Sequence, residues 1–133
     1  MTKVMIAASI CVWLAGPLLA MQPLHQNERV VQGFYVLGMA DLIRKRCDSI
    51  SPRLLNAYSY LKNLERYARD QGYSDTEIEA LVENDVEKAK LRAQIANDLA
   101  VRGASPETPE GYCAIGREEI AKGSEAGKLL RNR

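Results

Sequence analysis

Histidine and large aromatic side chains are scarce in this 133-residue chain, which has one Trp, one Phe and one His. A lone imidazole with no pair of cysteines beside it leaves no recognisable zinc site, because protein zinc sites combine several Cys and His ligands. The chain also has no Cys-x-x-Cys-His run for covalent attachment of haem. We therefore predict no metal and no cofactor, and we expect no catalytic or ligand role for His25.

Charge of either sign is not in excess, since 18 Lys and Arg residues stand against 17 Asp and Glu residues. An even balance provides no strong field for steering nucleic acid or an anionic membrane, so we expect no nucleic-acid partner. Linkers rich in Pro, Ser or Gly and internal repeats are missing from the sequence as well. The length and this uniform composition predict a single domain over residues 21–133.

The first twenty residues have the layout of a secretory signal peptide. Lys3 provides positive charge, residues 4–19 are almost wholly apolar, and the small Ala20 occupies a cleavage position. We predict cleavage after Ala20 and export to the periplasm, with no membrane span left after cleavage. A retained anchor is the alternative, although the apolar run is broken at Gly16-Pro17 and is shorter than the roughly 20 residues that a spanning helix needs.

Two cysteines, Cys47 and Cys113, remain after cleavage. An oxidising compartment and an even number of cysteines favour one structural disulfide between them. Closing so long a loop contributes about 4 kcal/mol to stability in the chain-entropy model. A redox-active pair is disfavoured because no Cys-x-x-Cys spacing lowers a thiol pKa, and two free buried thiols are the remaining alternative.

Apolar residues at helical spacing predict a first helix over residues 28–46, capped by Asn27 and ending in three consecutive bases that suit its C-terminal dipole. Ser51-Pro52 predicts the cap and first turn of a second helix that runs to Gln71. Gly72 is expected in the left-handed closing position, with Tyr73 packed back on the last turn. The predicted apolar stripe of the second helix begins with Leu54, Leu55 and Tyr58.

A capping box formed by Ser74 and Glu77 predicts the start of a third helix, which we expect to run from Asp75 to about Arg102. Its apolar stripe narrows to small side chains that allow close approach of another helix, with Gly33 and Gly38 as candidate partners. The small residues are Ala89, Ala93, Ala96 and Ala100.

Residues 104–112 are predicted as an irregular loop, residues 114–122 as a last helix, and the segment from Gly127 to the C-terminus as a fraying end. No stretch alternates with period two, so we expect no sheet. The predicted fold class is all-α: a small four-helix arrangement behind a signal peptide, with three main helices and a C-terminal helix clamped by the disulfide.

Three acidic residues are the candidates for a catalytic carboxylate. Asp41 lies on an otherwise apolar helix, where pairing with Arg44 or Lys45 is favoured over a functional role. Glu118 and Glu119 are adjacent on a helix, so their side chains point about 100° apart and do not converge on one substrate atom. We predict no catalytic residue.

A candidate partner surface combines Tyr60, Tyr67, Glu79 and Glu83. The tyrosines lie seven residues apart on one helical face; half-buried packing is favoured for them, and exposure at an interface is the alternative. The glutamates belong to the acidic first half of the third helix. This half would attract a basic partner, although a solvated face is the default.

Several short strings, in this order behind a signal peptide, resemble a small family of secreted alphaproteobacterial proteins classed as a domain of unknown function. They are Cys47 to Arg53, Ser59 to Leu61, Gly72 to Glu79, Cys113 to Ile120 and Gly127 to Leu130. The similarity covers roughly residues 28–131. The resemblance implies a periplasmic location, supports the pairing of the two cysteines and brings no catalytic residues.

We expect a non-enzymatic interaction module, an accessory or assembly factor that binds a protein or complex of the cell envelope. One alternative is a small stress- or acid-responsive periplasmic chaperone, in which acid protonates Asp41 and the acids of the third helix and exposes apolar surface. A second alternative is an enzyme with a carboxylate site around Asp41 or Glu118.

Overall fold

The computed structural model describes residues 20–133. The predicted signal peptide lies outside this part of the chain, apart from the exposed Ala20. Within residues 20–133 the chain forms five α-helices, two short 3-10 helices and one sheet of two very short strands, so the all-α class is confirmed. The elements are η1 (Leu24–Gln26), α1 (Glu28–Arg46), β1 (Ile50–Pro52), α2 (Leu54–Asp70), α3 (Asp75–Glu83), α4 (Asp85–Val101), α5 (Glu110–Lys122), η2 (Gly127–Leu129) and β2 (Leu130–Asn132).

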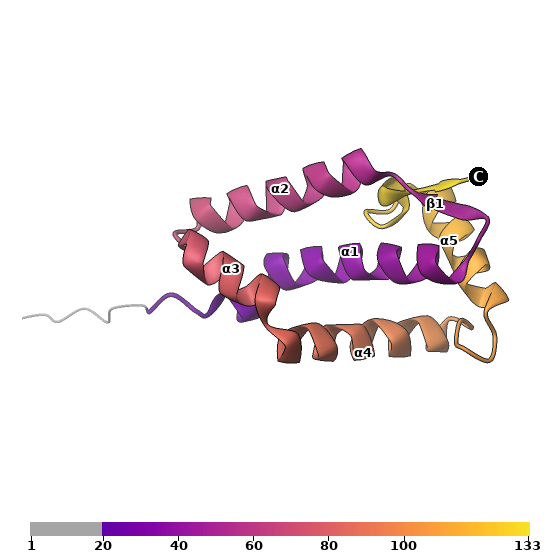
Figure 1. Ribbon diagram of the computed structural model, residues 1–133, viewed down its shortest axis with the longest axis horizontal. Coiled ribbons are helices and arrows are strands. Elements are labelled where there is room, and N and C mark those ends of the chain that lie inside the picture. The colour runs from indigo at the N-terminus through magenta and orange to yellow at the C-terminus, as the bar shows by residue number, and fades with distance from the viewer. Residues whose placement is uncertain (1–19) are drawn as a thin grey trace, which may run out of the picture.

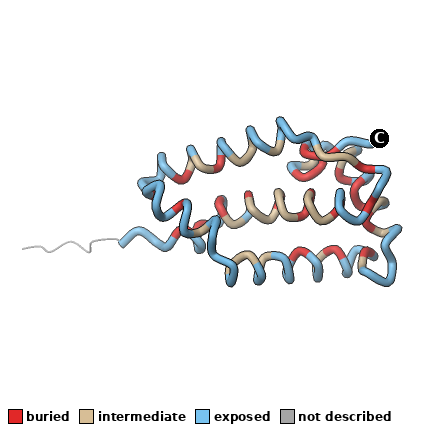
Figure 2. Tube along the Cα trace, viewed as in Figure 1, coloured by how far each residue is buried: buried red, intermediate tan, exposed pale blue. Residues whose placement is uncertain are grey.

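Helix α1 is the central element, with α2 and α4 along its two sides, α3 at one end, and α5 with the two strands at the other end (Figure 1). Its predicted bounds are confirmed, and the Asn27 side chain accepts a hydrogen bond from the Val30 N–H at 3.2 Å. The buried residues of α1 lie on several sides of the helix because neighbours surround it (Figure 2). They are Val30, Gly33, Val36, Met39, Ala40 and Ile43.

Ser51 and Pro52 do not begin helix α2, as the sequence predicts, but form strand β1. The C-terminal strand returns beside them in antiparallel register, with Ser51 opposite Arg131 and Pro52 opposite Leu130. Pro52 suits this place because a proline without an N–H is tolerated on an edge strand. The expectation of no sheet is therefore wrong at this one corner, where the end of the chain provides backbone partners that no local pattern indicates.

The end of α2 and the start of α3 match their predicted caps. Gly72 has φ +96°, and the N–H of the buried Tyr73 donates to the Ala68 carbonyl at 3.1 Å. At the next helix, the Ser74 hydroxyl accepts from the Glu77 N–H at 3.2 Å while the Glu77 carboxylate accepts from the Ser74 N–H at 2.8 Å. Both caps are local, which explains why the sequence alone identifies them.

The predicted long third helix is wrong, because the chain breaks at Asn84 into α3 and α4. Asn84 is extended (φ −72°, ψ 99°), and its side chain accepts from the Val86 and Glu87 N–H groups, both at 3.1 Å. Asn is among the best N-cap residues, so a new helix starts here. The predicted four-helix arrangement thereby gains a fifth helix.

The face that α4 turns toward α1 also differs from the prediction. The row of small residues is exposed, and larger side chains that include Ile95 and Leu99 pack inward instead. Gly38 does allow close approach of α4, since a Cβ there would lie 2.6 Å from Ile95 Cδ1, whereas Gly33 accommodates Leu64 of α2. The exposed small residues are Ala89, Ala93, Ala96 and Ala100.

The predicted stripe of α2 is correct only in its second half. Leu64 and Ala68 are buried, but Leu54, Leu55 and Tyr58 are 71%, 82% and 62% exposed. Helix α2 diverges from α1 toward its own N-terminal end (Figure 1), so these three side chains are not covered by α1.

The Cys47–Cys113 disulfide is confirmed, and it joins the end of α1 to the first turn of α5. Helix α5 begins four residues before the predicted start, and the C-terminal segment that follows it does not fray. Leu129 and Leu130 are buried in the larger of two core clusters. Gly127 is required in this segment because a Cβ there would collide with the Glu119 backbone carbonyl.

Replacing both cysteines, Cys47→Ala with Cys113→Ala, is expected to lower the free energy of unfolding by about 4 kcal/mol, because the bond closes a loop with a sequence separation of 66 residues. Urea denaturation of the oxidised wild type and of the double variant measures this difference. Ser49→Ala is the matched control, since Ser49 Oγ lies 3.1 Å from Cys47 Sγ without forming the bond. A double variant as stable as this control would contradict a structural role for the disulfide.

Candidate functional site

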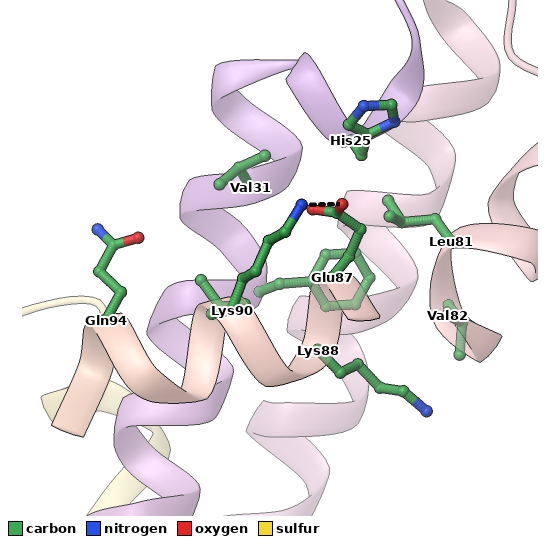
Figure 3. Close-up of a pocket in the computed structure, with 10 residues that line it drawn as sticks. His25, Val31, Leu81, Val82, Glu87, Lys88, Lys90 and Gln94 are labelled. Atoms are coloured by element: carbon green, nitrogen blue, oxygen red, sulfur yellow. Dashed lines mark hydrogen bonds and ion pairs between the residues drawn. The ribbon is translucent and has the colours of Figure 1, made fainter. Parts of the chain in front are cut away.

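An apolar groove of about 400 Å³ lies between the first turns of α1, the end of α3 and the first half of α4 (Figure 3). We call it the α3–α4 groove. Its apolar wall consists of Val31 and Phe34 from α1, Leu81 and Val82 from α3, and Leu91 from α4. Its polar rim consists of His25, Glu87, Lys88, Lys90 and Gln94.

The break at Asn84 creates the groove. A continuous helix would carry the α3 side chains past α1 on one straight axis, but the extended Asn84 lets α3 leave at an angle to α4. Leu81 and Val82 then lie on one side of the gap, and Leu91 lies on the other. The groove was therefore not predictable from a pattern that treated residues 75–102 as one helix.

Ion pairs order the rim of the groove. Lys90 donates to Glu87 at 2.9 Å, and Lys88 lies 2.8 Å from Asp85 (Figure 3 marks the first pair). The hydrogen bond from Lys90 lowers the pKa of Glu87, and that from Lys88 lowers the pKa of Asp85. Both carboxylates are therefore ionised at neutral pH. The result is an apolar trough bordered by charges of both signs.

The outer side of this groove is acidic. Residues 75–87 contain six carboxylates and no Lys or Arg. Glu79 and Glu83, two members of the predicted partner surface, are exposed on α3 and take part in no ion pair within residues 20–133. Val82, beside Glu83, is 44% exposed at the lip of the groove, and Val86 beyond it is 64% exposed. Acidic and apolar groups therefore alternate along this edge.

The two tyrosines of the predicted partner surface are half-buried and have different surroundings. Tyr60 packs against the larger core cluster, and burial raises its pKa. Tyr67 packs against the smaller cluster, with the Arg29 guanidinium 4.2 Å from the centre of its ring. This is the packing that the sequence favoured.

Asp41 is engaged by its own helix. It accepts hydrogen bonds from Arg44 at 2.6 Å and from Lys45 at 2.6 Å. Partial burial by itself raises the pKa of Asp41, but the hydrogen bonds from Lys45 and Arg44 outweigh it and hold the pKa below its usual value. Asp41 also lines a hollow of about 270 Å³ with Pro52 and Leu54, and its negative charge there is balanced by Arg44 and Lys45.

Glu118 and Glu119 do converge, contrary to the prediction from helix geometry, because Arg102 reaches both. Its Nη2 donates to Glu119 at 2.6 Å and to Glu118 at 3.2 Å, which ties the end of α4 to α5. Glu119 is buried and accepts a further hydrogen bond from the Ser124 hydroxyl. Lys122 also donates to Glu118 and, with Arg102, lowers its pKa. The pair therefore forms a clamp between helices.

A second polar contact links α1 to α4 beside this clamp. The Tyr35 hydroxyl donates to Asp98 at 2.9 Å. Burial and this hydrogen bond raise the pKa of Tyr35 to about 12. The contact satisfies two polar groups within the helix interface.

His25 lies on the rim of the groove, where its ring nitrogen is 3.4 Å from the Gln26 amide nitrogen. The sequence predicts no role for His25, and the position of His25 beside Leu81 depends on the same break at Asn84. Residues 20–133 gather no group of three or more His, Cys, Asp or Glu side chains that would suit a metal ion. Within the same residues, no helix combines the length and the apolar character needed to cross a bilayer.

These features define a small disulfide-linked helical bundle with an apolar groove between three helices. The chain belongs to a family of unknown function (DUF5333), whose model matches residues 22–131. A search of curated proteins and a search of solved structures each found no match.

The clamp provides a direct test of which acid is structural. Glu119→Gln is expected to lower the free energy of unfolding by about 1–3 kcal/mol, because a buried charged acceptor of Arg102 is lost. Glu118→Gln is the matched control on the neighbouring residue; its side chain is 47% exposed, so the loss should stay below about 1 kcal/mol. Urea denaturation at pH 7 compares the two variants, and equal losses would contradict the assignment.

Proposed function

We propose that the protein is a non-enzymatic interaction module of the periplasm, an accessory or assembly subunit for a complex of the cell envelope. The signal-peptide layout of residues 1–20 supports export and cleavage after Ala20. The resemblance to secreted alphaproteobacterial proteins supports the same compartment. The observation that carries the proposal is the α3–α4 groove, which offers an apolar trough where a partner can bury side chains.

The chemistry of the groove indicates its occupant. Between residues 75 and 90 there are six acidic side chains and two basic ones, Lys88 and Lys90, and both bases are already paired with acids. A partner segment with apolar residues on one face and Lys or Arg beside them would fill the trough and meet Glu79 and Glu83. We therefore assign the groove to a basic amphipathic helix of a partner protein.

The carboxylates suggested for an enzyme are poorly suited to proton transfer. Asp41 is held by two cations of its own helix, and Glu118 by Lys122 and Arg102. Both acids have a lowered pKa, so neither holds a proton to donate near neutral pH, and each is a weaker base than a free carboxylate. This favours binding over catalysis.

Crosslinking of the full-length protein in its native envelope, with wild type and variants compared at equal expression, tests the groove. Val82→Glu should reduce recovery of a stoichiometric partner roughly tenfold or more, because it places a charge at the apolar lip. Glu79→Lys with Glu83→Lys should reduce it similarly by repelling a basic segment.

Val101→Glu is the matched control, since Val101 is 83% exposed at the far end of α4 and should leave recovery unchanged. Mapping of the crosslinks should place the contact on a basic amphipathic segment of the partner. Equal recovery with Val82→Glu and Val101→Glu would overturn the assignment of the groove, and recovery of many unrelated proteins would favour a chaperone.

A second candidate function, an acid-activated chaperone, is favoured by one observation. Several carboxylates that accept hydrogen bonds or form ion pairs have a lowered pKa in the folded protein. They are Asp41, Glu77, Asp85, Glu87, Glu107 and Glu118. The unfolded chain binds protons more tightly at these groups, so acid favours opening.

The sign of this effect predicts a specific pH window. The stability contributed by a carboxylate with a lowered pKa is fully present above its unfolded pKa of about 4 and is lost as the pH falls through the folded value. A chaperone should therefore bind an apolar dye and protect clients from aggregation only below about pH 4. Fluorescence and near-UV circular dichroism between pH 7 and pH 2 measure this. A protein that stays folded and inert throughout that range would exclude this function.

A further inference from the structure

An exposed apolar surface lies at the end of the molecule opposite α3, where β1 leads into α2 (Figure 1). Leu54, Leu55 and Tyr58 lie in the first two turns of α2 and are 71%, 82% and 62% exposed. We call these three residues, together with Pro52, Arg53 and Arg131, the Leu54 corner. Both leucines border an open hollow of about 460 Å³ beside the helix start, and most of each side chain remains exposed.

The charged groups around the Leu54 corner are predominantly basic. Arg53 and Arg131 line the same hollow as the leucines, and neither forms an ion pair within residues 20–133. Arg53 Nε donates to the Leu130 carbonyl at 3.0 Å, which fixes its stem and leaves the other guanidinium donors available. Lys62 extends over the Tyr58 ring at 5.7 Å. The nearby acids are already engaged: Glu65 by Lys62, and Glu125 by Lys128.

Local context increases this positive character. Helix α1 ends at the same end of the molecule with Arg44, Lys45 and Arg46. Asp41 pairs with the first two of these bases, and one further acid, Asp48, follows in the turn before β1. The first ten residues of α2, 54–63, contain no acid. The even net charge of the chain thus conceals a separation, with acids concentrated on residues 75–87 and unpaired bases at the Leu54 corner.

We propose that the Leu54 corner docks the protein on the surface of a membrane rich in anionic lipids. Two protruding leucines suit insertion among lipid chains, which need no preformed shape, and Tyr58 suits the polar boundary of the bilayer. Arg53 and Arg131, which form no ion pair within the described residues, attract anionic headgroups while their stems cover apolar surface. An acidic protein would meet the same charges, but it would need a cavity shaped for both leucines.

Flotation of the disulfide-bonded mature chain, residues 21–133, with lipid vesicles tests this docking. The protein should bind vesicles of equal parts phosphatidylglycerol and phosphatidylethanolamine but not vesicles of phosphatidylcholine, and added salt should weaken binding. Leu54→Ser with Leu55→Ser should weaken binding about tenfold or more through lost apolar insertion. Arg53→Gln with Arg131→Gln should weaken it about tenfold or more through lost attraction to anionic lipids.

Val86→Ser, at an exposed valine near the α3–α4 groove, is the matched control and should bind vesicles like the wild type. Circular dichroism and thermal unfolding check that each variant remains folded, which the exposure of the replaced side chains favours.

Absence of binding to anionic vesicles, equal binding to phosphatidylcholine, or unchanged binding by both double variants would overturn the proposal. If the protein binds no vesicles and the two double variants instead lose an acidic protein partner in the crosslinking experiment, the Leu54 corner is assigned to that protein. Since groove variants do not alter the corner, failure here is distinguishable from failure of the proposed groove function.

Discussion

The Cys47–Cys113 bond is the constraint on which most of this small fold depends. It attaches the end of the central helix α1 to the start of α5, and α5 in turn positions the C-terminal segment through the close contact of Gly127 with Glu119. That segment buries Leu130 and pairs as a strand with Ser51. The same pairing holds residues 50–52 in an extended strand and delays the start of α2, so one covalent bond shapes both the core and the corner beyond it.

Asn84 has a comparable effect at the opposite end. A side chain that caps a new helix changes the direction of the chain, and the changed direction opens the α3–α4 groove. The break also resets the helical phase. In a continuous helix the apolar stripe of α3 would extend into the alanines of α4. After the break, Ile95 and Leu99 face α1 instead, because they bury more apolar area. Groove and helix face are thus two results of one cap.

Features set by neighbouring residues could be predicted from the sequence, and features set by distant segments could not. The bounds of α1, the Gly72 turn, the Ser74–Glu77 capping box and the cysteine pairing were all predictable because each rests on a local signal or a simple count. The two-stranded sheet and the exposed start of α2 depend on where the C-terminus returns. The groove could not be predicted because Asn also occurs inside helices, so the presence of Asn84 does not by itself identify a helix break.

Net charge was the least informative property of this sequence, because the nearly zero total combines an acidic end and a basic end of the molecule. Electrostatic attraction in salt acts over about 8–10 Å, so a partner responds to the nearest patch rather than to the sum over the chain. Glu79 and Glu83 border the groove at one end, while Arg53 and Arg131 border exposed leucines at the other. A chain docked on lipid by its basic corner would therefore direct the acidic groove away from the membrane, where a soluble segment of an envelope protein can reach it.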